Sequence, residues 1–451
     1  MQPGPLVLVL LCCCLSGGGA NRVYIHPFHL FAADNVSCET LQNHTFQPLE
    51  SVSVAPLDMA VLTPDQRGPS ERDNVTQDVT QRTAVLAELV NSLGLRMYQA
   101  LSGKQPAANT LFSPVNTYGS LLTFDLGASK KTARSFQDLL GLSSGTDRED
   151  CVSLVDAGMV LKTLHSINQQ LQHHISAQAW LFTRPHVRLS QDVVQGASDF
   201  SHSSFVRAVD FSERGEHLQR VNTFVENTSS GKVKEAFRDV DANFDLLFLT
   251  SFRFQGNFQS HKTSLQEFHV DPTTTVMTPM MTHVGLHHYF HDTMRRCTVI
   301  KLSLSERSYM LVVLPDHGVN LHDLQAKLRT DLISSWKINL HQRLLELSLP
   351  KLSMSSVNDV RHLLGNMDPE VESRLLGSQA EFSQLANSDT FTLDKAINAV
   401  SLEMSEEEAA PWEKMKEDGQ QVTINRPFFF SVMDADCDAM FLLGKISTPA
   451  L

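Results

Sequence analysis

The sequence predicts a single α+β domain behind a long N-terminal tail. Helical periodicity marks the first part of the body, where apolar residues recur every three or four positions over residues 85–97. Apolar runs of strand length mark the second part, and the chain ends in a predicted hairpin over residues 422–446. Helices that come first and strands that come later indicate one α+β domain.

The helices are expected where start and stop residues frame the apolar periodicity. The first starts near Thr83. The second starts at Ser113 and Pro114, because serine caps free amides and proline suits the first helical position, and it ends at residues 126–128. Further helices are predicted over residues 160–171, over residues 221–233 with a stop at Gly231, and over residues 357–364 with Gly365 closing the helix.

Strands are predicted where short apolar runs lie between turn residues. The first covers residues 177–182, and the next, residues 246–254, is rich in aromatic residues and ends at Gly256. Others are predicted at residues 298–304, 310–314, 345–349 and 391–404, and the final hairpin joins residues 422–432 to residues 439–446 through a turn at residues 434–438.

The first twenty residues have the features of a signal peptide. Residues 6–15 form an apolar core, and the small residues 17–20 supply a cleavage site before Asn21. No later run is long and apolar enough to span a bilayer. The mature chain is therefore expected to be secreted and soluble.

The net charge, the cysteines and the glycosylation sequons indicate which partners and which compartment the protein has. The net charge of −13 argues against nucleic acid or an anionic membrane as the partner. Of seven cysteines, four remain after the leader, and an even number in an oxidising compartment leaves three full pairings open. Four N-glycosylation sequons predict a secreted glycoprotein, and they start at Asn35, Asn43, Asn74 and Asn227.

The tail, residues 21–82, is polar and carries three of these sequons. Prolines at positions 48, 56, 64 and 69 interrupt it, which predicts a long and weakly structured segment. Its first ten residues, NRVYIHPFHL, directly follow the leader and are expected to be an exposed N-terminus.

This decapeptide, residues 21–30, has the features of a protease substrate. Val23 and Ile25 favour extended backbone, and Pro27 disfavours helix at the residue before it. Aspartic proteases bind their substrates as extended strands, and Leu30 and Phe31 place large apolar side chains on both sides of one peptide bond. The alternative is an N-terminal strand that only pairs with a sheet edge.

The same ten residues resemble the angiotensin peptide hormones, with Asn21 standing where many members have aspartate. The resemblance implies that renin cuts between Leu30 and Phe31, and that angiotensin-converting enzyme then cuts between Phe28 and His29. The two cuts would leave an octapeptide, residues 21–28, which by the same resemblance would act on a G-protein-coupled receptor as a vasoconstrictor that regulates blood pressure and salt balance. Its receptor-binding residues would be Asn21, Arg22, Val23, Tyr24, Ile25, His26, Pro27 and Phe28.

The body carries a series of short sequence marks in a specific order and spacing. They are Asn109 with Ser113-Pro114; Leu126-Gly127-Ala128; Val209-Asp210-Phe211; Thr228 with Gly231-Lys232-Val233; Phe252 with Gly256-Asn257-Phe258; Val276 with Met280-Met281; Asn425-Arg426-Pro427-Phe428; and Phe441 with Gly444-Lys445 and Pro449. In these marks the chain resembles the serpins over nearly all of residues 83–451. The resemblance implies three sheets, about nine helices and an exposed reactive loop before the C-terminal hairpin.

The predicted loop does not suit protease inhibition. An inhibitory serpin inserts its cleaved loop as a new strand, which requires small hinge residues, whereas this hinge carries Glu406, Glu407 and Glu408 and then Pro411. In an inserted strand at least one carboxylate faces the core at a cost of several kcal/mol, and the proline removes a ladder hydrogen bond. We expect a non-inhibitory serpin; the alternatives are an inhibitory serpin and a serpin-type carrier of a small apolar hormone.

No pattern in the sequence predicts an enzyme, a cofactor or a metal site. The chain has no G-x-S-x-G, HExxH or Walker pattern. His283, His287, His288 and His291 form the most enzyme-like group, but Gly285 and β-favouring neighbours indicate a strand. A packed or solvated histidine cluster is therefore favoured over a metal site.

By resemblance to the angiotensin precursors, Cys38 and Cys151 form a disulfide. This disulfide either only stabilises the fold or also determines how the Leu30–Phe31 peptide bond is presented to the protease. Cys297 and Cys437 are expected to be buried free thiols. The predicted organisation is a signal peptide (residues 1–20), the decapeptide (21–30), a glycosylated tail (31–82) and a serpin domain (83–451).

Overall fold

The computed structural model describes residues 26–33, 50–65, 77–143, 154–169, 171, 173–210, 214–238, 240, 245–386, 393–409 and 419–449. Several predicted features lie outside these ranges: the signal peptide, residues 21–25 of the decapeptide, Cys38, Cys151, Pro411 and the sequons at Asn35, Asn43 and Asn74. Within the described ranges, no helix is long and apolar enough to cross a membrane.

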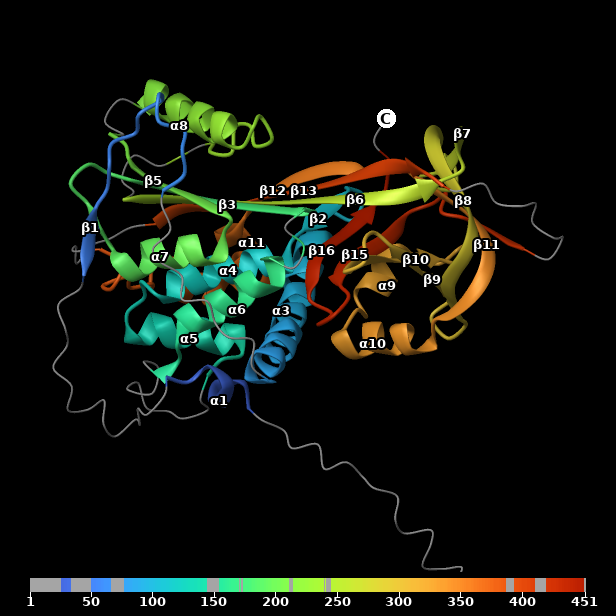
Figure 1. Ribbon diagram of the computed structural model, residues 1–451, viewed down its shortest axis with the longest axis horizontal. Coiled ribbons are helices and arrows are strands. Elements are labelled where there is room, and N and C mark those ends of the chain that lie inside the picture. Colours follow the sequence, from blue (N-terminus) through green and yellow to red (C-terminus); the bar gives the residue numbers. More distant parts are fainter. Residues whose placement is uncertain are drawn as a thin grey trace, which may run out of the picture.

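The described strands form three sheets, so the α+β expectation is confirmed (Figure 1). A five-stranded sheet has the order β12 (Ser353–Asp359), β13 (Leu393–Glu408), β6 (Leu246–Ser260), β3 (Ile175–Thr183), β5 (Ser203–Ala208). A nine-stranded sheet has the order β14 (Gln420–Thr423), β11 (His341–Pro350), β8 (Thr275–Asp292), β9 (Cys297–Ser303), β10 (Ser308–Pro315), β15 (Phe428–Asp434), β16 (Met440–Ile446), β2 (Thr110–Phe112), with β7 (Lys262–His269) paired to β8. The third sheet pairs β1 (Ser51–Ser53) with β4 (Arg188–Ser190).

Eleven helices accompany these strands in the described ranges. Figure 1 shows α3 to α7 gathered on one face of the five-stranded sheet and α8 on the other. The helices are α1 (Pro27–Phe31), α3 (Gln77–Lys104), α4 (Pro114–Asp125), α5 (Lys130–Leu140), α6 (Ala157–Gln169), α7 (Gln191–Phe200), α8 (Arg214–Thr228), α9 (Leu321–Gln325), α10 (Thr330–Asn339), α11 (Val360–Met367) and α12 (Pro369–Leu375).

Helix α4 lies at the centre of the fold, and all of its residues are buried. Its start is the predicted one. The Ser113 side chain accepts a hydrogen bond from the backbone N–H of Asn116 at 3.2 Å, and Pro114 occupies the first turn. A helix that is buried on every side can serve as a platform for its neighbours.

A buried polar network joins α4 to the middle of the five-stranded sheet. Asn398 on β13 accepts hydrogen bonds through Oδ1 from Thr250 on β6 at 2.7 Å and from Ser120 on α4 at 3.1 Å. Its Nδ2 donates to Thr117 on α4 at 2.8 Å. Because each of these contacts satisfies a buried group, separating β13 from β6 would leave several polar atoms unpaired.

Several predicted boundaries differ from the structure. The helix predicted over residues 221–233 is α8, which begins at Arg214 and ends at Thr228, and the strand predicted at residues 391–404 is β13, which continues to Glu408. Helix α3 begins six residues before Thr83, because polar residues extend the helix beyond its apolar face. Strand β6 continues through Gly256, where the missing side chain admits Met404 of the neighbouring strand. Helix α11 begins only at Val360, because Asp359 caps it, and it runs past Gly365. Pro427 separates β14 from β15, so β14 pairs with β11 instead of extending the C-terminal hairpin.

Residues 50–65, which we call the strap, contradict the expectation of a weakly structured tail. The strap follows the edge of the five-stranded sheet: Leu57 donates a backbone hydrogen bond to Ala208 of β5 at 2.9 Å. Asp65 accepts from the backbone N–H of Val206 at 2.7 Å and from the guanidinium of Arg207 at 2.6 Å. The strap therefore satisfies donors on an edge strand that would otherwise lack partners.

Candidate protease-cleavage site

The end of the decapeptide forms a short helix, α1. The His26 backbone is extended, with φ −63° and ψ 136°, as the residue before a proline prefers. The His26 ring then caps the helix, because its Nδ1 accepts from the backbone N–H of Phe28 at 3.3 Å. Pro27 occupies the first helical position, where a missing N–H costs nothing. The same proline that disfavours helix at His26 therefore favours one immediately after it.

The α1 helix is docked on the body and packs against α3 and α6. The Phe31 side chain is 0% exposed and belongs to the main hydrophobic core, while Phe28 and Leu30 are partly buried against that core. Only His29 in this helix is exposed. The expectation of an exposed, extended N-terminus is therefore wrong for residues 27–31, which form a docked helix, because the Phe31 side chain packs into the core of the body.

Hydrogen bonds to backbone carbonyls hold both sides of the predicted cleavage point. The carbonyl of Leu30, which belongs to the Leu30–Phe31 peptide bond, accepts from Arg82 Nε on α3 at 3.0 Å. The carbonyl of Phe31 accepts from the backbone N–H of Asp156 at 2.8 Å. Just beyond, Ala33 donates to the carbonyl of Leu154 at 2.6 Å.

This geometry conceals the bond from a protease. A cleft that binds an extended strand requires the helix to unwind and the Leu30 carbonyl to be free. Burial of a phenylalanine contributes about 1.5–3 kcal/mol and each hydrogen bond about 0.5–1.5 kcal/mol. Cleavage at Leu30–Phe31 therefore requires α1 to leave the body first.

The hinge of the predicted reactive loop lies at the end of β13. This strand pairs with β6 without interruption from Ala396 opposite Phe248 to Glu408 opposite Ser260. Glu406, Glu407 and Glu408 are all exposed. Glu406 accepts from Thr263 Oγ1 and Glu407 from Asn257 Nδ2, each at 2.6 Å.

A comparison with known protein families identifies the body. The family model described as "Serpin (serine protease inhibitor)" matches residues 88–449. The chain belongs to the serpin family.

This serpin is similar to angiotensinogens over nearly its whole length. It is 27% identical to the angiotensinogen of Bos taurus, with 99% of this chain and 98% of the relative covered. It is 28% identical to that of Rattus norvegicus (95% and 94% covered) and 27% identical to that of Homo sapiens (98% and 97% covered).

Solved structures of other serpins show the same fold. Mouse protein-Z dependent protease inhibitor superposes with a TM-score of 0.72 at 19% identity, covering 82% of this chain and 99% of that chain. A thyroxine-binding globulin complex with thyroxine superposes with a TM-score of 0.69 at 21% identity, covering 81% and 100%. At this identity the likeness concerns the fold alone.

The histidine cluster of this serpin lies in β-structure, on β8, as predicted. His283 Nδ1 is 2.8 Å from His287 Nε2, and the ring of His283 lies over Gly285, where a Cβ would be 2.5 Å away. Burial lowers the pKa of His287 to about 4 and also lowers that of His283, so both rings are neutral at pH 7. His261, which sequence reasoning missed, stacks on His283 with ring centroids 5.1 Å apart.

The other two histidines of the predicted group lie apart from this contact. His291 pairs with Asp316 at 3.1 Å, and His288 lies opposite Lys301 of β9. No group of three or more metal-ligating side chains in the described ranges is placed to hold a metal ion. The structure therefore brings two of the four predicted histidines together, in a packed contact.

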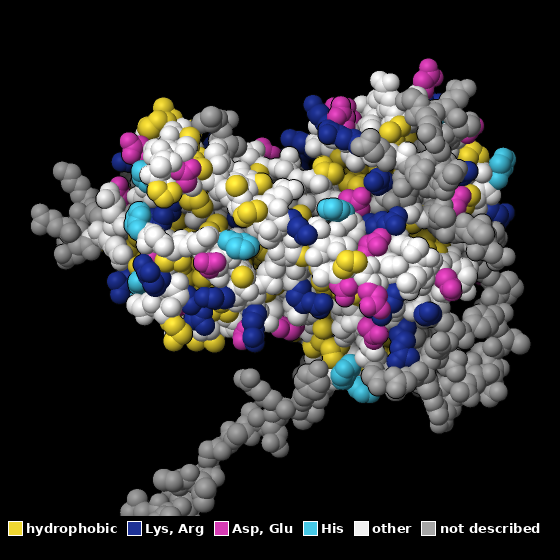
Figure 2. Space-filling view, turned by 180° about the vertical axis from the view of Figure 1, so that it is seen from behind, with side chains coloured by type: hydrophobic (Ala, Val, Ile, Leu, Met, Phe, Trp, Pro, Cys, Tyr) yellow, Lys and Arg dark blue, Asp and Glu magenta, His cyan; other side chains and the backbone are white. Residues whose placement is uncertain are grey.

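The remaining predicted sites are only partly described. Cys297 is a buried free thiol, and Cys437 is free and partly buried; burial raises the pKa of both thiols, that of Cys297 to about 12. Asn227, the one sequon asparagine in the described ranges, is exposed near the end of α8. Figure 2 shows acidic and basic side chains interspersed over one face of the described residues, without the single basic stripe typical of nucleic-acid binding.

Substitution of Arg82 tests whether docking limits cleavage. Arg82→Ala removes the hydrogen bond to the Leu30 carbonyl, worth about 0.5–1.5 kcal/mol, so an aspartic protease should cut Leu30–Phe31 roughly two- to tenfold faster. The measurement is the initial rate of product formation by mass spectrometry, with the exposed Arg96→Ala on the same helix as the matched control. Equal rates for Arg82→Ala, Arg96→Ala and the unmodified protein would show that this bond does not restrain the site.

Proposed function

We propose that this serpin is a secreted hormone precursor of the renin–angiotensin type, with a body that carries the peptide and does not inhibit proteases. The observation that carries the proposal is the docked end of the decapeptide. The segment that resembles angiotensin ends at Leu30, and the body holds the Leu30 carbonyl and the Phe31 side chain. The similarity to angiotensinogens over nearly the full chain supports the same function.

The proposed sequence of events uses external proteases throughout. Renin cleaves after Leu30 and releases residues 21–30, and angiotensin-converting enzyme then removes His29 and Leu30. The octapeptide, residues 21–28, acts on a G-protein-coupled receptor as a vasoconstrictor. The body contributes by controlling how often α1 leaves its docking site, because only the undocked segment can enter a protease cleft.

Incubation with renin tests this proposal directly. The expected product is a single peptide covering residues 21–30, identified by mass spectrometry. Leu30→Asp should abolish the product, because an aspartic protease cleft accepts a large apolar side chain and excludes a charge. Absence of the decapeptide from the unmodified protein, or a cut elsewhere in the tail, would overturn the assignment of the cleavage site.

The disulfide between Cys38 and Cys151, implied by resemblance, is proposed to stabilise this docking. Cys38 follows Ala33 by five residues and Cys151 precedes Leu154 by three. Ala33 and Leu154 are already joined by a backbone hydrogen bond, so the two cysteines are within the reach of their chains. Peptide mapping without reduction should yield a linked Cys38–Cys151 peptide, and free thiols at both positions would contradict the bridge.

The closed sheet supports a non-inhibitory body. An inserted strand would have to enter between β6 and β13, breaking their register pairs and the Asn398 network. The three hinge glutamates already pair with β6 at the exposed end of β13, and in an inserted strand at least one of them would turn toward the core, where unpaired carboxylates are costly.

Cleavage of the loop followed by heating tests for insertion. A protease that nicks the chain within residues 410–418 should leave the melting temperature unchanged or slightly lower, because no new strand enters the sheet. The control is the uncut protein heated in parallel under the same conditions. A large rise in melting temperature after the cut would show that the loop inserts and that the body retains an inhibitory transition.

A further inference from the structure

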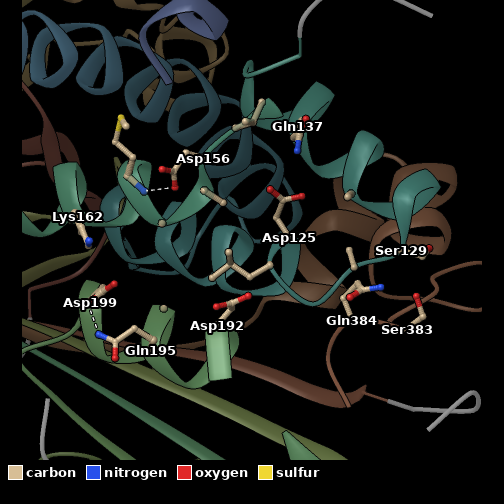
Figure 3. A pocket seen from close by; sticks show the side chains of 18 of the residues that line it. Asp125, Ser129, Gln137, Asp156, Lys162, Asp192, Gln195, Asp199, Ser383 and Gln384 are labelled. Carbon is tan, nitrogen blue, oxygen red and sulfur yellow. Dashed lines mark hydrogen bonds between the residues drawn. The ribbon is translucent and has the colours of Figure 1, made fainter. Parts of the chain in front are cut away.

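A large cavity opens beside the helices of the body (Figure 3). Arg82 and Asp156, which hold the docked α1 segment, lie at its margin, but the proposed hormone function does not use the interior of the cavity. Its volume is about 1000 Å³, which is within the range of small-molecule sites. The end of α4, the first two turns of α5, the start of α6, one side of α7 and residues 381–384 form its walls. Apolar side chains contribute part of the lining, among them Leu126, Val155 and Met159.

Asp125, the last residue of α4, is the most unusual group in this cavity. The residue is only 6% exposed, and its Oδ1 has no hydrogen-bond partner among the described residues. Figure 3 shows its carboxylate pointing into the space between the side chains of Asp156 and Gln137. Burial raises the pKa of Asp125 to about 7, although a hydrogen bond from Gln137 opposes the shift. A buried carboxylate with an empty acceptor position is costly and requires an explanation.

The side chains around Asp125 do not neutralise the negative charge of its carboxylate. The lining contains five acidic side chains and three basic ones. The basic side chains are Arg82 of α3, Lys131 of α5 and Lys162 of α6. The other acids are Asp156 just before α6, Asp192 and Asp199 of α7, and Glu381. The excess of acidic groups makes the cavity favourable for a cation.

We propose that this cavity binds a small organic cation, an amine or amidine with a compact apolar body, and that Asp125 is its counter-ion. The apolar lining accommodates the body of the ligand, and the buried carboxylate fixes the charged end with a charge-assisted hydrogen bond. A bare divalent ion fits poorly, because such ions require several convergent oxygen ligands and no such group is placed to hold a metal ion in the described ranges.

Benzamidine and its neutral counterpart benzamide provide matched probes. Isothermal titration at pH 8 should show saturable binding of benzamidine, at least tenfold tighter than that of benzamide. Asp125→Asn keeps the shape of the side chain and removes its charge, so it should lower the affinity for benzamidine at least tenfold. The matched control is Asp192→Asn, an exposed aspartate of the same cavity, which should change the affinity by less than threefold.

The pH dependence of the unmodified protein tests the same counter-ion without any substitution. Benzamidine stays charged from pH 5 to 8, while a proton competes with it for Asp125 below the pKa of about 7. Its affinity should therefore fall roughly tenfold for each pH unit below about 7 and be constant above it. Equal binding of benzamide, an unchanged affinity of Asp125→Asn, or a flat pH profile would each overturn the proposal, and none of these results bears on renin cleavage.

Discussion

The pairing of β13 with β6 is the constraint on which the rest of the structure depends. It closes the five-stranded sheet from residue 396 to residue 408, and Asn398 fastens this pairing to the buried helix α4. The helices α3, α6 and α7 all pack against α4. Two of them, α3 and α6, form the surface on which α1 docks. The position of the peptide therefore rests on a platform that the closed sheet holds in place.

Docking of α1 is weak by comparison with the body that supports it. Among the described residues it consists of the buried Pro27 and Phe31, the partly buried Phe28 and Leu30 and a few hydrogen bonds. Together these contacts amount to several kcal/mol before the entropy of ordering is subtracted. Global unfolding of a domain typically requires about 5–15 kcal/mol. Local opening of α1 is therefore far cheaper than unfolding, so a protease can capture the open segment while the rest of the serpin stays folded.

Local sequence signals predicted those parts of the fold that local chemistry decides. Ser113 and Pro114 cap α4 as expected, and Gly231, with a φ of +74°, follows the end of α8 as expected. The body could also be placed in its family from short marks in order, which the family match over residues 88–449 confirms.

The features that were missed depend on partners distant in sequence. Pro27 disfavours helix at the residue before it and favours helix at the residues after it, so the sequence alone does not decide the conformation of this segment. The helix forms because it packs against α3 and α6, and these elements are distant in sequence. The strap is ordered because Asp65 meets Arg207, 142 residues away. In the sequence, Asp125 is recognisable only as a residue near the end of a helix. Its burial results from packing against elements that no local pattern specifies.

The exposed glutamates of the hinge connect the state of the sheet to the way the peptide is released. In the closed sheet all three side chains are exposed, and Glu406 and Glu407 accept hydrogen bonds from neutral groups, so they carry little burial cost. Insertion would bury some of them, and the free-energy gain that drives insertion in an inhibitor would be reduced or lost. A serpin body that gains no free energy from loop insertion undergoes no large conformational change that could be coupled to the N-terminal segment. The rate of peptide release is then set by the local equilibrium of α1 and by the affinity of the protease for the open segment.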